Sequence, residues 1–253
     1  MQTAYAASTE SGLDIALSAE PVFYIGHVAI TNTIITTWVV VVLIAITAFL
    51  VGQNLKKIPS RTQAFFELAV GGLLDYMESV LESRHLAKKY FPMVASLFIF
   101  ILTANWFGLL PGITAITVAT ADGATKLFHP VNTDLNSTLA LAIIAFLFIE
   151  AAGVSRLGFL KYASKFVNVR SAIGFVTGII EMLSELARIV SFSFRLFGAM
   201  FAGKVLLLVV MFFVPFVLPV PVLLLELGVG LIQAAVFAIL TLVFIKIAIA
   251  EPH

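Results

Sequence analysis

The chain has 253 residues, of which 61% are hydrophobic and 11% charged, whereas about 25% are charged in soluble domains. This composition excludes a soluble globular protein and predicts an all-α polytopic membrane protein. The net charge of +1 gives no indication of nucleic-acid binding, and a chain without cysteine has no disulfides, thiolate metal sites or cysteine nucleophiles.

The first predicted element is a membrane span over residues 30–52, long enough for the roughly 20 residues that a spanning helix needs. Residues 1–29 form an acidic segment before it, and we expect residues 30–253 to form a single membrane domain. A basic cluster follows the span at once: Lys56, Lys57 and Arg61. The positive-inside rule therefore places the N-terminus outside and this cluster in the cytoplasm.

Residues 62–89 have apolar positions at helical spacing, alternating with acidic and basic residues. This pattern predicts an amphipathic helix that lies on the cytoplasmic surface and ends at Lys88-Lys89. The alternative is a solvated helix beneath a soluble subdomain.

A second span is predicted over residues 91–110, and the turn-forming residues between it and Asn136 predict an external loop. A third span is predicted over residues 137–154. Four basic residues follow it: Arg156, Lys161, Lys165 and Arg170. Both basic loops fall on the cytoplasmic side, so the predicted topology is consistent with itself.

Residues 171–215 form one apolar stretch far longer than the roughly 30 Å membrane core requires. The stretch is either two short spans or one steeply tilted helix, and the lack of an internal proline or basic turn favours the tilted helix. Prolines at 215, 219 and 221 make a turn, and residues 222–250 return as the last helix of a hairpin over 171–250. Five crossings then leave the C-terminus in the cytoplasm.

The long helix carries a polar stripe whose members are 3, 4, 3 and 4 residues apart: Glu181, Ser184, Arg188, Ser191 and Arg195. This spacing places them on one face over about 21 Å. Small residues at Gly198 and Ala202 extend the same face and allow another surface to approach closely. Arg188 also lies three residues after Glu185, so a local ion pair is the alternative for Arg188.

Arg195 is the most informative residue because a guanidinium stays protonated in almost any environment. A charge at membrane depth costs roughly 3 kcal/mol on insertion scales, so it normally faces a partner or an aqueous path. Lys204 lies nine residues further on, about 180° around the helix. In the returning helix Glu226 and Gln233 share a face, and we predict that Lys204 pairs with Glu226 across the hairpin.

Two offset polar routes, one from each side of the membrane, would let an ion enter from either face but not pass straight through Arg195. Only a carrier with a carboxylate could pass, and an arginine beside a carboxylate lowers its pKa so that it releases its proton. The missing partner is therefore an acidic group on another, moving subunit.

The sequence around the arginine is Arg195-Leu-Phe-Gly198-x-Met200-x-Ala202-Gly203, and four further motifs accompany it: Phe91-Pro92, Asn105-x-x-x-Leu-Leu-Pro111, Thr133-Asp134-x-Asn136-x-Thr138, and Glu226-Leu-x-x-x-x-Ile-Gln233-Ala. Through these motifs the chain resembles the a subunit of F-type ATP synthases. The family often has Asn at the position of Ala199 and a His or an acid at that of Lys204.

The resemblance implies a stator that faces a ring of c subunits, with Arg195 opposing each ring carboxylate and Gln233 near Arg195. Glu181, Ser184, Arg188 and Ser191 would serve the cytoplasmic half-channel, and Asn105, Lys204 and Glu226 the external one. Gly198 and Ala202 would contact the ring. The implied partners are the c-ring, b-type peripheral stalk subunits, the catalytic head indirectly and membrane lipid.

The resemblance also implies a bacterial inner membrane location and no catalytic site, cofactor or metal on this chain. His27, His85 and His129 fall in predicted loop or surface positions without metal-ligand spacing. Two other functions remain open from the residues alone: a transporter or channel in which Arg195 binds an anionic substrate, and an assembly subunit with buried ion pairs.

Overall fold

A computed structural model of the chain describes residues 19–53, 56, 60–120, 123–158, 161–162 and 172–250. Within these residues, five helices are long and apolar enough to cross a membrane: α1 (Asn32–Gln53), α3 (Arg84–Gly108), α4 (Leu135–Leu157), α6 (Ala172–Phe213) and α7 (Pro219–Ile249). The predicted class, an all-α polytopic membrane protein, is confirmed.

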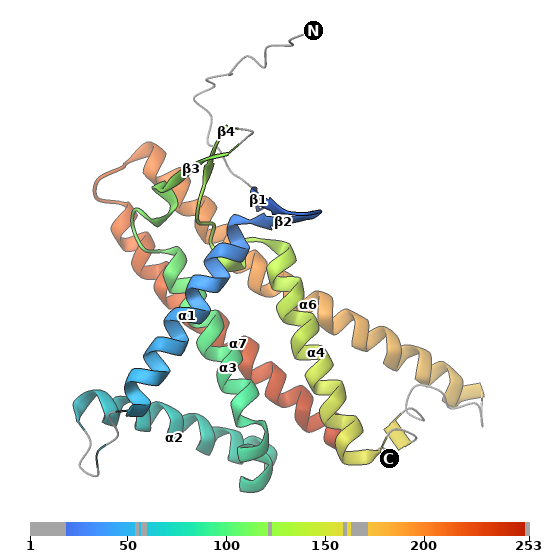
Figure 1. Ribbon diagram of the computed structural model, residues 1–253. Helices are drawn as coiled ribbons and strands as arrows, with labels where there is room; N and C mark the ends of the chain where they lie inside the picture. Colours follow the sequence, from blue (N-terminus) through green and yellow to red (C-terminus); the bar gives the residue numbers. More distant parts are fainter. Residues whose placement is uncertain are drawn as a thin grey trace.

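The two ends of the bundle differ in what they carry (Figure 1). The helix α2 (Arg61–Leu81) lies across one end, which we call the α2 end. Two short hairpins lie at the opposite end, together with the α6–α7 turn, and we call this the strand end. The hairpins pair β1 (Pro21–Ile25) with β2 (Val28–Thr31) and β3 (Thr117–Thr120) with β4 (Gly123–Lys126).

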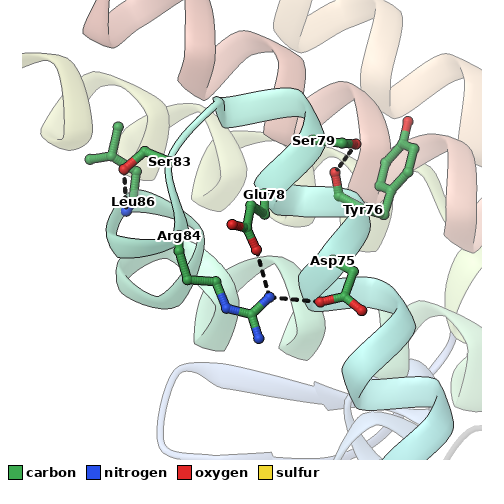
Figure 2. Close-up of polar contacts among 7 residues, drawn as sticks. All are labelled: Asp75, Tyr76, Glu78, Ser79, Ser83, Arg84 and Leu86. Carbon is green, nitrogen blue, oxygen red and sulfur yellow. Dashed lines mark hydrogen bonds and ion pairs between the residues drawn. The ribbon is translucent and has the colours of Figure 1, made fainter.

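The amphipathic helix predicted over 62–89 ends at Leu81, eight residues earlier than expected, because the chain turns at Glu82. Glu82 has a left-handed backbone (φ 55°), and the Ser83 Oγ then caps α3 by accepting a hydrogen bond from the Leu86 N–H at 3.4 Å. Arg84 bridges the break with ion pairs of 2.7 Å to Asp75 and 2.7 Å to Glu78 (Figure 2). The apolar periodicity continues through the turn, so spacing alone did not locate it.

The long apolar stretch is one unbroken helix, α6, as the sequence favoured. Its 42 residues correspond to about 63 Å at 1.5 Å per residue, roughly twice the thickness of a membrane core. It runs diagonally through the bundle in Figure 1. The return helix α7 begins at Pro219 rather than at residue 222. The first turn of a helix tolerates proline, because the backbone N–H groups there have no carbonyl partner within the helix and the missing N–H costs no hydrogen bond.

The external N-terminal segment predicted over 1–29 and the external loop predicted before Asn136 contain the two hairpins, although β2 continues to Thr31. Asn32 links the two hairpins. The Asn32 N–H donates to the Glu20 carbonyl at 3.0 Å, just before β1. The Asn32 side-chain amide donates to the Lys126 carbonyl at 3.2 Å, at the end of β4. The strands of both hairpins are only four or five residues long, so turn-forming residues dominate the sequence pattern of these two segments.

The core lies where α3, α4, α6 and α7 pack against one another, and aromatic rings fill the contact between α6 and α7. Phe192 stacks on Phe237 with ring centroids 4.9 Å apart, and Phe244 meets it edge-on at 5.6 Å. Helix α1 lies at the periphery, where Val40 packs with Ala104 of α3. The α6–α7 hairpin therefore packs against α3 and α4.

Part of the charge pattern behind the predicted topology falls outside the described residues. Lys57, Lys165, Arg170 and the segment before residue 19 lie there, while Arg156 is in the last turn of α4. The orientation in the membrane and the single membrane domain over 30–253 therefore stay predictions.

Candidate functional site

A cavity of about 220 Å³ lies at the strand end, between α3, α6, α7 and the segment that joins β4 to α4. Since a water molecule occupies about 30 Å³ of liquid, the cavity has room for several. Its polar and charged lining is Glu20, Asn32, Asn105, Lys126, His129, Asn132, Thr133, Lys204 and Glu226. The three residues predicted for one half-channel, Asn105, Lys204 and Glu226, thus line one space.

Glu226 is a carboxylate inside the helix bundle, and a glycine makes room for it. Its side chain comes from the second turn of α7, and the residue is only 2% exposed. A Cβ atom at Gly203 of α6 would overlap with both carboxylate oxygens of Glu226. Lys204 follows Gly203 and lines the same cavity, and the ion pair predicted between Lys204 and Glu226 stays a prediction.

Asn105 links three elements around the cavity through hydrogen bonds. Its amide donates to the Gly230 carbonyl of α7 at 2.9 Å, and its carbonyl accepts from the Asn132 amide at 2.7 Å. Gly230 permits this approach, because a Cβ there would lie 3.1 Å from that of Asn105. The Asn132 Oδ1 atom is buried without a partner among the described residues, so it is left for cavity water.

We expect Asn105→Ala to lower the stability of the subunit by about 2 to 4 kcal/mol, because the Gly230 carbonyl and the Asn132 amide each lose a buried partner. The measurement is the thermal unfolding of the solubilised complex. Asn136→Ala is the matched control, since Asn136 is exposed in the first turn of α4. Equal losses in both variants would contradict the structural role assigned to Asn105.

His129 was predicted to lie in a loop or at the surface, and the structure corrects this: it is 4% exposed in the cavity wall, whereas His27 and His85 are exposed as predicted. The backbone N–H of His129 donates to the Thr36 hydroxyl at 3.2 Å, and the ring Nε2 lies 3.2 Å from the Thr133 hydroxyl. Burial and the nearby positive charges of Lys204 and Lys126 lower the pKa of His129 from 6.5 to about 4. His129 is therefore neutral at ordinary pH.

Arg195 lies on the outer surface of α6 and not in the cavity. Its guanidinium donates to the Ser191 hydroxyl at 3.0 Å, and no carboxylate in the described part of the chain forms an ion pair with it. Exposed apolar side chains occur close to it on α6: Phe194 is 56% exposed and Val190 53%. A charged side chain within a membrane-spanning helix normally faces a partner or an aqueous path.

The predicted polar stripe is exposed in part, because Arg188 turns into the bundle. It forms an ion pair with Glu185 and lies 4.0 Å above the ring of Phe244, so the local ion pair considered for Arg188 is confirmed. Ser184 and Ser191 are exposed, and Glu181 is half-buried. The other residues of this face, Gly198 and Ala202, are exposed beside Arg195.

Gln233 is half-buried in α7, and the described residues show no hydrogen bond between it and Arg195.

Sequence reasoning missed His129, Asn132 and the spatial role of Gly203. The only available signal for the first two was their place in a polar loop beside the Thr133-Asp134 motif. The role of Gly203 depends on which α7 side chain faces it.

These features define a class of protein: a multi-pass membrane protein whose long helical hairpin carries charged groups within a cavity of the bundle and another charged group on its outer face. Residues 34–246 match the family model of the ATP synthase A chain. The chain belongs to this family and is accordingly a membrane subunit of an ATP synthase.

Proteins called ATP synthase subunit a are similar over nearly the whole length. That of Geobacter sulfurreducens is 31% identical, over 88% of this chain and 89% of its own. That of Trichlorobacter lovleyi is 32% identical over 89% and 90%, and that of Campylobacter fetus is 32% identical over 85% and 89%. The family suggested by the sequence motifs is thereby confirmed.

Proposed function

We propose that this chain is the ion-translocating stator of its ATP synthase, with two offset half-channels separated by Arg195. The observation that carries the proposal is the placement of charge on α6. Arg195 is on the exposed apolar face, while Lys204 faces the buried cavity with Glu226. An ion in the cavity and an ion near Arg195 therefore lie on different sides of the same helix.

The cavity serves as the external half-channel, with Asn105, Lys204 and Glu226 in its wall. Glu181, Ser184 and Ser191 lead along the other half of α6 to the cytoplasm, with Arg188 behind them in its pair with Glu185. Gln233 lies near the point where the two routes pass Arg195. Positive residues at the α2 end, among them Lys88, Lys89 and Arg156, support a cytoplasmic location for that end.

Arg195 opposes carboxylates on a rotating ring of c subunits. A guanidinium next to a ring carboxylate lowers its pKa and makes it release its ion into one half-channel, after which the same carboxylate is reloaded from the other. Since Arg195 stays positive, a free cation cannot leak from one half-channel to the other. Gly198 and Ala202 let the ring approach this face closely.

Ion flow down its gradient then turns the ring and drives synthesis in a separate catalytic head, so this chain itself carries out no bond chemistry. One elementary charge gains about 2.3 kcal/mol for each 100 mV, so several ions are needed for each ATP. The remaining partners are b-type peripheral stalk subunits and lipid, and the location is a bacterial inner membrane with the N-terminus outside.

Disulfide cross-linking tests which face meets the ring, and a chain without cysteine gives no background. We expect Gly198→Cys and Ala202→Cys to cross-link to a cysteine beside the carboxylate of the c subunit. Gly198 has open space for a new side chain. Val42→Cys is the control, because Val42 is 55% exposed on the peripheral helix α1. Cross-linking of Val42→Cys alone would refute this arrangement.

A further inference from the structure

His129 presents one basic nitrogen. The Thr133 hydroxyl lies 2.9 Å from the Pro130 carbonyl and 3.2 Å from the His129 Nε2; when it donates to Pro130, its oxygen accepts from an Nε2–H. On this network we assign the hydrogen of the neutral imidazole to Nε2, which leaves the lone pair on Nδ1. Within the described residues no donor satisfies Nδ1, which leaves it available to water in the cavity.

The other charged groups of the cavity are less suited to passing protons. Lys126 and Lys204 carry ammonium groups, which donate hydrogen bonds and have no lone pair to accept a proton. Glu20 and Glu226 are carboxylates at different places in the lining, one before β1 and one on α7. An imidazole is the side chain that both accepts and donates protons most readily, and His129 is the one that lines this cavity.

We propose that His129 is a proton-relay residue of this cavity that passes protons to Glu226; the proposal rests on the proposed function. Nδ1 takes a proton from a hydronium ion in the cavity and leaves a water molecule. The imidazolium then gives a proton, through cavity water, to the Glu226 carboxylate, which becomes a carboxylic acid. The imidazole returns to its neutral Nε2–H form, so the cycle transfers one proton and changes no other group.

The charges that face His129 favour a short-lived imidazolium. Burial, and then the charges of Lys204 from α6 and Lys126 from β4, destabilise its positive form, and its pKa of about 4 makes it a readier proton donor than an ordinary histidine. Glu226 from α7 and Glu20 from the N-terminal side are the nearby acceptors in the lining, and Asp134 is held at the cap of α4. The proton therefore moves on rather than being trapped on His129.

The test uses the whole ATP synthase in vesicles, with ATP synthesis driven by a potassium diffusion potential. We expect His129→Ala to assemble and to lower the synthesis rate about tenfold to a hundredfold. This loss is at or below the roughly hundredfold to ten-thousandfold contribution of a proton-transfer residue, because cavity water still offers a slower path for the proton. Added imidazole should restore much of the rate, whereas pyrazole, of similar shape and far lower basicity, should not. His27→Ala, which alters an exposed turn, should retain the wild-type rate.

His129→Gln guards against a merely structural effect, because its amide can still donate to Thr133 but cannot take up a proton. This variant should assemble fully and remain slow. A wild-type rate in His129→Gln, or a slow His129→Ala that imidazole does not accelerate, would overturn the relay. If Arg195→Ala abolishes synthesis in the same vesicles, such a result refutes the relay alone; if Arg195→Ala leaves synthesis intact, the proposed function fails as well.

Discussion

Arg195→Ala is expected to abolish ion-driven ATP synthesis while the complex still assembles. The side chain is exposed on α6 and makes a single hydrogen bond, to Ser191 on the same helix, so removing it leaves no buried group unpaired in the described structure. Its loss removes the fixed positive charge that makes a ring carboxylate release its ion. ATP synthesis under an imposed gradient measures the effect, and the amount of assembled complex is measured alongside.

Arg84→Gln is the matched control for a lost arginine. Arg84 forms exposed ion pairs with Asp75 and Glu78 at the α2–α3 break (Figure 2), and exposed pairs contribute little to stability. We expect this variant to synthesise ATP at nearly the wild-type rate. Near-normal synthesis in Arg195→Ala would refute the stator mechanism, whereas loss of assembly in that variant would point to the alternative of an assembly subunit.

The number and order of the spanning helices could be predicted because each carries a long apolar run that has no other stable solution in a membrane. Their ends could not. The break between α2 and α3 depends on the left-handed backbone of one residue, Glu82, inside a continuing apolar pattern. Pro219 and Pro221 predicted a turn, but both lie in the first turn of α7. The hairpins around 21–31 and 117–126 have strands too short to show a clear alternation of apolar and polar residues, so the turn-forming residues decided the prediction for these segments.

The candidate site divides in the same way. Arg195 stood out because its cost in an apolar helix is a local property of the sequence. The cavity wall was only partly predictable, because His129, Asn132 and Gly203 belong to it through contacts between distant segments. Helical spacing predicts which face of α6 a residue occupies but not where its side chain points. Arg188 shares a face with four other polar residues, yet its side chain turns into the bundle to contact Glu185 and Phe244.

Gly203→Ala is expected to reduce ion-driven ATP synthesis by at least about tenfold, although it adds only one methyl group. In an ordinary helix this change is favourable by roughly 0.5 to 1 kcal/mol. Here the new Cβ would overlap with the Glu226 carboxylate, which is buried in the α6–α7 contact and must move. Because crowding a packed interior costs typically 1 to 3 kcal/mol, we expect about that loss of stability as well.

Two further variants separate displacement of Glu226 from a general effect of alanine. Gly72→Ala in α2 adds the same methyl group where no atom lies within 4 Å, so both synthesis and assembly should persist. Shortening the crowded side chain in Gly203→Ala with Glu226→Asp should recover part of the lost stability, because the carboxylate is then withdrawn by one methylene. If Gly203→Ala alone supports normal synthesis, the position of Glu226 over Gly203 has no bearing on ion transfer, since the methyl group cannot be accommodated without moving that carboxylate.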